Sequence, residues 1–288
     1  MTGRDDLADR FETHRSHLRS AAYRMLGSLS EADDAVQEGW LRLSRTGADG
    51  IDNLGGWLTT VVARVCLDIL RTRRSRREEA FAADAPEPVA SGTSGSSPEQ
   101  EALLADSVGL ALLVVLDRLA PAERVAFVLH DMFAVPFEEV APIVGRSLEA
   151  TRQLASRARR RVRGGEADAS GLARQREVID AFLAALRAGD LQGLLAVLDP
   201  DLVVRTDIPG APSEIHGAAD WAKGAASFGH LARLVTPALV DDAVGLVMAP
   251  RGRLVRALRF QFGQGRITEI EIISDPGRVD ELEVSVVE

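Results

Sequence analysis

The chain has 288 residues, a formal net charge of −9 and one cysteine, Cys66. This length predicts two or three domains, the negative charge excludes a protein that coats nucleic acid with its whole surface, and a single cysteine excludes an intramolecular disulfide. Because the first residues lack the apolar core of a signal peptide and no apolar run is long enough to span a bilayer, we expect a cytoplasmic protein without membrane contact.

Three amphipathic helices are predicted within residues 5–80. The second begins at Ser30, which we expect to be its N-cap, and keeps one face polar. Four polar residues are predicted to be exposed on that face, namely Asp33, Asp34, Gln37 and Glu38. Carboxylates in a first turn also stabilise the helix dipole, so this acidic face is either a binding surface or a purely structural one.

Positive charge is concentrated in two segments of this acidic chain. Residues 64–77 contain six arginines and one acid, and residues 146–163 contain seven arginines and one acid. Such a distribution is expected when two separate parts of a protein contact the phosphates of a nucleic acid.

A linker and a second helical module follow. Residues 81–100 are rich in Ala, Pro, Gly and Ser and show no apolar period, which predicts a flexible linker. Residues 101–165 predict an all-α bundle, which begins with a strongly apolar helix.

The bundle ends in a helix-turn-helix. Gly145 supplies the turn, Ser147 is the expected N-cap of the second helix, and Thr151, Leu154 and Ala158 fall on its inward face. Its other residues can pair with base edges or phosphates, and the candidate DNA contacts are Ser147, Glu149, Arg152, Gln153, Ser156, Arg157 and Arg160. The alternative is a solvated basic helix that packs on its neighbour.

Residues 172–277 predict a separate α+β domain. An amphipathic helix is followed by five segments of β type, at 202–206, 234–240, 244–248, 254–262 and 267–274. Gln264 and Gly265 are expected to form the turn of a hairpin between the last two strands. We expect a curved antiparallel sheet, with residues 278–288 as a tail.

Four residues of this domain are candidates for the chemistry of a pocket: Asp207, His216, Trp221 and His230. A general base needs an apolar pocket and a partner that tunes its pKa, and the sequence shows the residue types without showing that they meet. The spacing of His, Cys and carboxylate residues predicts no metal site, and we expect no cofactor.

Three segments together carry a family resemblance: residues 31–43, 57–78 and 116–163. In order and spacing they resemble an extracytoplasmic-function (ECF) sigma factor of the sigma-70 family, with region 2 at residues 5–80 and region 4 at residues 101–165. The last domain looks like the SnoaL-like group of cone-shaped α+β folds. Chains that join these parts resemble the SigJ-type subgroup.

The resemblance implies roles for residues already named. The acidic face, Asp33 to Glu38, would bind the clamp of the β′ subunit of core RNA polymerase, and region 4 would bind the β flap. Asp52 and Asn53 would hold a base flipped from the minus-ten element of promoter DNA. Four arginines would hold the DNA backbone: Arg64, Arg71, Arg73 and Arg74.

The resemblance also implies that the chain is not an enzyme and that a small molecule or a protein acts on it through the C-terminal domain. Two alternatives remain open. One is a helix-turn-helix regulator whose C-terminal domain senses a ligand. The other is a bifunctional protein whose C-terminal domain is an isomerase or a cyclase, since the cone fold serves enzymes and binding domains alike.

Overall fold

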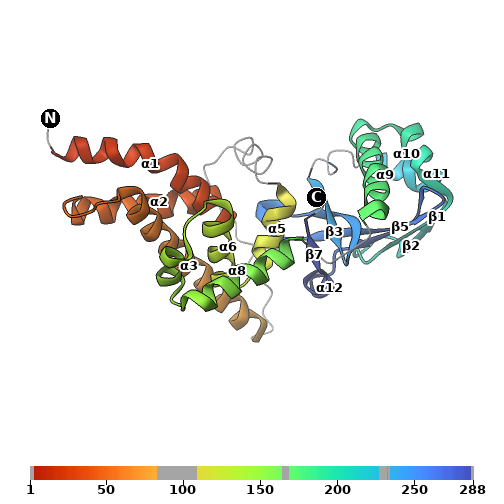
Figure 1. Cartoon of the computed structure of the whole chain (residues 1–288). Helices are drawn as coiled ribbons and strands as arrows, with labels where there is room; N and C mark the ends of the chain where they lie inside the picture. Colours follow the sequence, from red (N-terminus) through yellow and green to blue (C-terminus); the bar gives the residue numbers. More distant parts are fainter. Residues whose placement is uncertain (1–2, 83–108, 164–168, 227–231, 233, 287–288) are drawn as a thin grey trace. The chain divides into compact units, whose positions relative to one another are not determined.

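The computed structural model describes residues 3–82, 109–163, 169–226, 232 and 234–286 (Figure 1). They divide into an N-terminal unit, comprising Met1–Val108 and Leu116–Arg159, and a C-terminal unit, comprising Gly109–Val115 and Arg160–Glu288. The predicted linker lies outside the described residues except for its first two positions, which end a helix. His230 also lies outside them.

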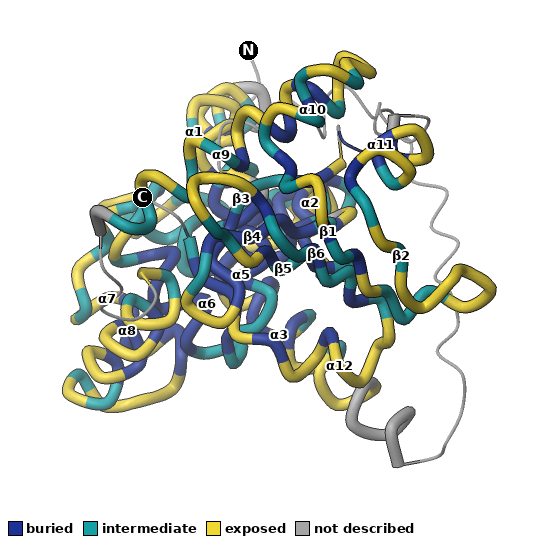
Figure 2. The backbone as a smooth tube through the Cα atoms, turned by 90° about the vertical axis from the view of Figure 1, so that its right-hand side faces the viewer, coloured by how far each residue is buried: buried dark blue, intermediate teal, exposed yellow. Residues whose placement is uncertain are grey.

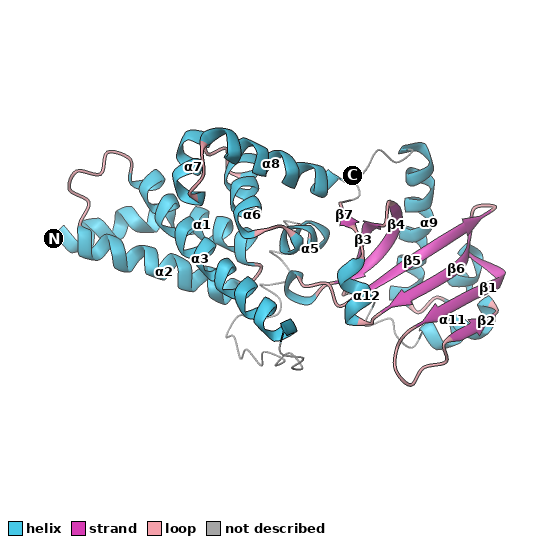
Figure 3. Cartoon of the chain, turned by 90° about the horizontal axis from the view of Figure 1, so that it is seen from below, coloured by secondary structure: helices cyan, strands magenta, loops and turns pink. Residues whose placement is uncertain are grey.

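The N-terminal unit is all helical, as predicted. Its first three helices are α1 (Gly3–Leu26), α2 (Leu29–Thr46) and α3 (Leu54–Ala82). The helices that follow are α5 (Leu110–Arg118), α6 (Pro121–Phe127), the π-helix η1 (Val128–Met132), α7 (Phe137–Val144) and α8 (Leu148–Arg163). The start of α5 and the last residues of α8 belong to the C-terminal unit. Figure 3 shows these helices as one bundle.

The start of α2 differs from the prediction by two residues. Ser28, rather than Ser30, is the N-cap, because its Oγ accepts the backbone N–H of Glu31. Gly27 ends α1 with a φ of 71°, the left-handed conformation that favours glycine at the end of a helix, and α2 begins two residues later at Leu29. Farther along α2, a Cβ at Gly39 would lie 3.0 Å from a methyl group of Val62, so glycine allows α2 and α3 to cross closely.

The C-terminal unit is an α+β domain built on one seven-stranded sheet, in the order β2-β1-β6-β5-β4-β3-β7. The strands are β1 (Leu198–Thr206), β2 (Glu214–His216), β3 (Val235–Val240), β4 (Ala243–Met248), β5 (Arg256–Gly263), β6 (Arg266–Ile273) and β7 (Val284–Ser285). The five predicted strands are confirmed, and Gln264 and Gly265 make the predicted turn with φ values of 51° and 79°. The sheet is not wholly antiparallel, because β1 runs parallel to β6.

Apolar residues cover both faces of this sheet. On one face α9 (Ala169–Ala188), α10 (Leu191–Val197) and α11 (Ala218–Ala226) pack on side chains such as Val204, Leu246 and Phe260. On the other face lie α12 (Pro276–Glu281) and the first turns of α5, packed on Val247 and Ala257. In Figure 2 much of the tube along the central strands is dark blue, the colour of buried residues.

The predicted domain boundaries therefore need two corrections. The start of α5 was assigned to the helical module, but Ala111, Val114 and Val115 belong to the core of the C-terminal unit. Residues 278–288 were assigned to a tail, but they contain the end of α12 and the strand β7, which pairs with β3. The N–H of Val286 also donates to the carbonyl of Val162, which ties this strand to the end of α8.

Candidate nucleic-acid interface

Helix α8 has the two faces that the sequence predicts for a recognition helix. Gly145 adopts the left-handed conformation between α7 and α8, and Ser147 caps α8 by accepting the N–H of Ala150 at 3.2 Å. The inward residues Thr151, Leu154 and Ala158 are buried, together with Ala155. The outward candidates are exposed, namely Ser147, Glu149, Arg152, Gln153, Ser156, Arg157 and Arg160.

The exposed residues of α8 differ in whether their side chains already form hydrogen bonds or ion pairs within the protein. The Arg157 guanidinium donates to Glu123, a buried acid of α6, at 3.0 Å. Arg152 lies 3.6 Å from the carboxylate of Glu138 and 5.9 Å from the ring of Phe137. In the described part of the chain, the side chains of Gln153, Ser156 and Arg160 form no hydrogen bond or ion pair. These three are therefore the side chains most available to DNA.

The acidic face of α2 is also exposed, and two of its carboxylates already form ion pairs within the protein. Asp33 accepts from Arg19 at 2.6 Å, and Glu38 accepts from Arg42 at 2.8 Å. Asp34 and Gln37 make no such contact with any residue that the structure describes. A partner would therefore meet one unpaired carboxylate beside two that are neutralised.

The basic end of α3 contains one arginine with an internal role. Arg73 donates to the carbonyl of Leu26 at 2.9 Å and pairs with Glu31, so it fixes α3 to the junction of α1 and α2. The other three predicted backbone contacts, Arg64, Arg71 and Arg74, have exposed side chains. Arg71 lies 3.6 Å from Asp68 in an exposed pair, which is worth little in water.

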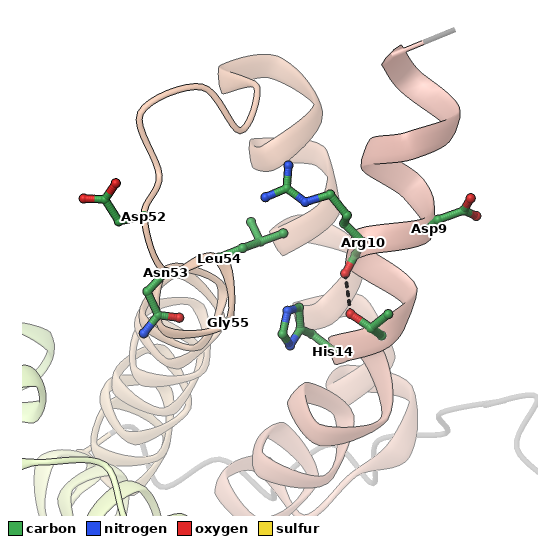
Figure 4. Close-up of a pocket in the computed structure, with 8 residues that line it drawn as sticks. Asp9, Arg10, His14, Asp52, Asn53, Leu54 and Gly55 are labelled. Atoms are coloured by element: carbon green, nitrogen blue, oxygen red, sulfur yellow. Dashed lines mark hydrogen bonds between the residues drawn. The ribbon is translucent and has the colours of Figure 1, made fainter. Parts of the chain in front are cut away.

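Asp52 and Asn53 lie in the loop before α3, at a cavity of about 500 Å³ (Figure 4). The loop side of the cavity consists of Asp52, Asn53, Leu54 and Gly55, and the other side consists of Asp9, Arg10, Thr13 and His14 of α1. The sequence analysis found the loop residues and missed the wall formed by α1, since periodicity alone does not show which part of a neighbouring helix faces a loop.

A contact between the first three helices and α6 to α7 was not predicted. Arg124 of α6 is fully buried, and it donates to Asp117 at 3.2 Å and to the carbonyl of Arg24 at 3.4 Å. Burial lowers the pKa of Arg124, and Asp117 opposes that shift. Phe133 lies 5.0 Å from the His17 ring and 5.2 Å from the Arg24 guanidinium. These contacts join the two helical modules inside the N-terminal unit.

The three candidate pocket residues of the C-terminal unit that the structure describes do not meet. Trp221 stacks on Phe182 at 5.9 Å, within the core between the sheet and its helices. His216 is exposed beside Glu214, on the opposite face of the sheet from Ile215, which packs on that core. Asp207 accepts the N–H of Ser274 at 2.6 Å and pairs with Arg278 at 3.1 Å. Three candidates in three surroundings do not form one catalytic site.

Neither a metal site nor a membrane span stands out in the part of the chain that the structure describes. The described His, Cys, Asp and Glu residues form no group of three or more that could hold a metal ion. Among the described helices, none combines the length and the apolar character needed to cross a bilayer.

The fold and its exposed surfaces define a class: a protein with two helical modules that present exposed acidic and basic faces, followed by an α+β domain. The families described as Sigma-70 region 2 and Sigma-70 region 4 match residues 10–76 and 109–162, respectively. The chain is 35% identical over 292 residues to the probable ECF RNA polymerase sigma factor SigI of Mycobacterium tuberculosis, and the match covers 98% of each chain. The chain belongs to the ECF family of RNA polymerase sigma factors.

A second relative supports the same family. The ECF RNA polymerase sigma factor SigJ of Mycobacterium tuberculosis is 45% identical over 208 residues, which are 71% of this chain and 66% of that protein. The crystal structure of SigJ aligns with 93% of this chain and 96% of its own, at 35% identity and a TM-score of 0.46. Membership of this family favours a sigma factor over the helix-turn-helix regulator that the sequence left open.

Proposed function

We propose that the chain binds core RNA polymerase and directs promoter-specific initiation of transcription in the cytoplasm, without being an enzyme itself. The observation that carries this proposal is the presence of an exposed acidic face on α2 and an exposed polar face on α8 within one family-matched chain. A lone DNA-binding regulator would have no use for the acidic face.

Different exposed surfaces of the chain are assigned to core polymerase and to promoter DNA. The acidic residues Asp33, Asp34, Gln37 and Glu38 are assigned to the β′ clamp, and region 4 also to the β flap. The exposed residues of α8 are assigned to the minus-35 element, because Arg and Gln side chains match the edges of guanine and adenine. The arginines of α3 and the loop before it are assigned to the minus-ten element, where the phosphates of a separated strand need a basic surface.

The C-terminal unit is assigned a regulatory role, with a small molecule or a protein as the effector. Two contacts support this assignment. The core of that unit contains Val114 and Val115 of α5, a helix that also contributes the buried Leu116 to the N-terminal unit. Just after β7, the N–H of Val286 donates a hydrogen bond to the carbonyl of Val162, which lies near the end of α8. An effector changes the activity of the chain only if it binds two conformational states of this unit with different affinities.

Reversing the charge of Asp34 is expected to weaken the binding of core polymerase by about 5-fold or more while the fold stays intact. Asp34 is exposed and, as the sixth residue of α2, lies beyond its first turn, so its carboxylate contributes less than the about 0.3–1 kcal/mol that a first-turn carboxylate gives its helix. The dissociation constant of Asp34→Lys for core polymerase, compared with its thermal unfolding, tests this expectation.

The matched control is Glu177→Lys, which makes the same change of charge at an exposed position of α9. It should leave the affinity for core polymerase unchanged. Equal weakening by both variants would indicate a general effect of net charge. Unfolding of Asp34→Lys would mean that the acidic face is structural.

Two residues of α8 are expected to behave differently on DNA. Gln153→Ala should cost about 1–3 kcal/mol and relax the preference at particular base pairs of the minus-35 element. Arg160→Ala should weaken binding to all sequences alike and reduce the slope of log affinity against log salt by about 1. Binding of the holoenzyme to a panel of promoter variants at several salt concentrations separates the two effects.

Arg176→Ala serves as the control for this comparison, because Arg176 is a half-buried arginine of α9, outside α8, that pairs with Asp180. It should change neither the base preference nor the salt slope. If Gln153→Ala and Arg160→Ala gave the same pattern across the panel, the division into base contacts and phosphate contacts would be wrong.

A further inference from the structure

Glu123 is a buried acid to which the proposed function assigns no role. It lies in the first turn of α6, and its side chain is 7% exposed. One carboxylate oxygen accepts the N–H of Ala120 at 3.3 Å, at the start of α6, and the other accepts Nε–H of Arg157 at 3.0 Å. Because a buried carboxylate is costly unless it is paired, Glu123 needs the guanidinium that α8 supplies.

The Arg157 guanidinium is held by one edge. Its Nε donates to Glu123, yet the side chain remains 49% exposed. Among the residues that the structure describes, Glu123 is the one with which this guanidinium forms a hydrogen bond or an ion pair. The two Nη groups carry four further N–H donors. These donors are available to an acceptor that approaches α8 from solvent.

The free edge lies on the side of α8 that is assigned to DNA. Gln153 and Arg160 are exposed four residues before and three residues after Arg157, and a helix brings such positions together. Since its Nε is tied to α6, the guanidinium is held at the flank of α8. When a recognition helix lies in the major groove, the phosphates run along its flanks, and the base edges lie beneath its centre.

A guanidinium fixed in this way is prepared for a phosphate. A free arginine loses rotamer freedom when it binds, whereas a side chain already held by a carboxylate has lost much of it beforehand. The planar fork of arginine can also serve two acceptors at different edges, which the point charge of a lysine ammonium does not.

The other acid beside an outward arginine of α8 lacks this geometry. Glu138 lies 3.6 Å from Arg152, and both side chains are more than half exposed. An exposed pair of this kind fixes neither partner firmly in water. Glu123 therefore differs from Glu138 in burial and in the direct hydrogen bond to its arginine.

We propose that Glu123 is a positioning residue for DNA recognition: it holds Arg157 so that the free edge of the guanidinium binds a backbone phosphate of the minus-35 element. The acid thus strengthens the binding of a polyanion, although its own charge opposes that binding. The contact reads no base, since phosphates carry no sequence information. This inference rests on the proposed function, because it requires α8 to lie on promoter DNA.

These two effects of Glu123 have opposite signs, so Glu123→Gln separates them. Glutamine keeps the shape of the side chain and an oxygen for the N–H of Ala120, but it removes the charge that holds Arg157. An acid that acted only through its charge would give tighter binding of DNA when removed. Positioning predicts an affinity about 2- to 10-fold lower for every duplex in a panel of minus-35 variants. The assay measures each duplex with the full chain bound to core polymerase.

Variants of the arginine complete the test. Arg157→Ala should weaken binding to all sequences and reduce the slope of log affinity against log salt by about 1, because one phosphate contact is lost. Adding Glu123→Gln to Arg157→Ala should cause no further loss, since the acid then has nothing to position. A further loss would overturn the inference.

Arg157→Lys keeps the buried acid paired, so it decides the question if Glu123→Gln proves to be unfolded at the temperature of the assay. Its single ammonium serves Glu123 at the expense of the phosphate, and the variant should bind all sequences more weakly than the parent. Binding equal to that of the parent would contradict the inference. Thermal unfolding of each variant shows whether its fold is intact.

Glu138→Gln is the matched control, because it removes one carboxylate beside another outward arginine of α8. It should leave the affinity unchanged or slightly higher. A loss equal to that of Glu123→Gln would mean that any acid beside α8 has the same effect, and the positioning role would fall.

The outcomes separate this inference from the proposed function. A wild-type chain that fails to bind core polymerase, or a holoenzyme whose affinity ignores the minus-35 sequence, would contradict the proposed function itself. A holoenzyme that distinguishes minus-35 sequences, while Glu123→Gln binds them as tightly as the parent or more tightly, would overturn the inference alone. A changed base preference in Glu123→Gln would overturn it as well, because the acid would then orient the whole of α8.

Discussion

Asp117→Asn is expected to lower the free energy of unfolding of the N-terminal unit by about 3–5 kcal/mol, the largest effect that we expect from a single surface-accessible carboxylate in this chain. Asp117 is the partner of Arg124, whose side chain is 2% exposed. Without the carboxylate, the guanidinium remains charged and buried, and its remaining partners are neutral, namely the carbonyl of Arg24 and the amide oxygen that replaces the carboxylate. An unpaired buried charge costs more than the pair contributes.

The measurement is urea unfolding followed by tryptophan fluorescence in a Trp221→Phe background. Trp40 and Trp57 then report on the N-terminal unit alone, because Trp221 belongs to the C-terminal unit. Arg124→Met combined with Asp117→Leu removes both charges and should recover most of the stability. If Asp117→Asn unfolded at the same urea concentration as the parent, the buried charge would have another partner and the argument would fail.

Val114→Asp is expected to destabilise the C-terminal unit by about 3 kcal/mol or more, although Val114 precedes the predicted start of that domain at residue 172. Its side chain is fully buried in the core formed with residues of β3 to β7, such as Val240 and Ile273. A Cβ at Gly252 would lie 3.3 Å from Cβ of Leu113, so the segment between β4 and β5 lies close to α5. A carboxylate introduced into this apolar core would find no hydrogen-bond donor there.

Trp221 reports on this change when Trp40 and Trp57 are replaced by phenylalanine. The milder Val114→Ala should cost about 1–3 kcal/mol, because it removes methyl groups without introducing a charge. An unaltered transition of Trp221 would show that α5 does not stabilise the C-terminal unit and belongs with region 4 alone. It would also remove the physical basis of the regulatory role assigned to the C-terminal unit.

Local patterns explain what could be predicted from the sequence. The buried and exposed faces of α8 follow from the positions of Thr151, Leu154 and Ala158, because a helix of 3.6 residues per turn places them together. The strands β5 and β6 follow from alternating residues and from the turn at Gln264 and Gly265. Each of these features depends on residues that are neighbours in the sequence.

Features that depend on distant residues were missed. The short strands β2 and β7 contain too few residues for an alternating pattern, and their pairing partners lie elsewhere in the chain. The burial of Arg124 depends on α1 and α3, and the cavity beside Arg10 depends on a loop some forty residues away. Asp207 lies in the loop after β1 and Trp221 lies on α11, and the residue types do not reveal how these two elements are placed in the domain.

The membership of α5 in the sheet domain has a consequence for protein synthesis. Val114 and Val115 leave the ribosome about 170 residues before strand β7 is translated, which takes roughly 10–30 s at ordinary rates. Throughout that interval the apolar side of α5 has no sheet to cover it, so a nascent chain is exposed to chaperones and proteases. The first turns of α5 therefore reach their folded packing only after β7 has been made, and a chain cut in the sheet would be expected to leave Ala111, Val114 and Val115 uncovered.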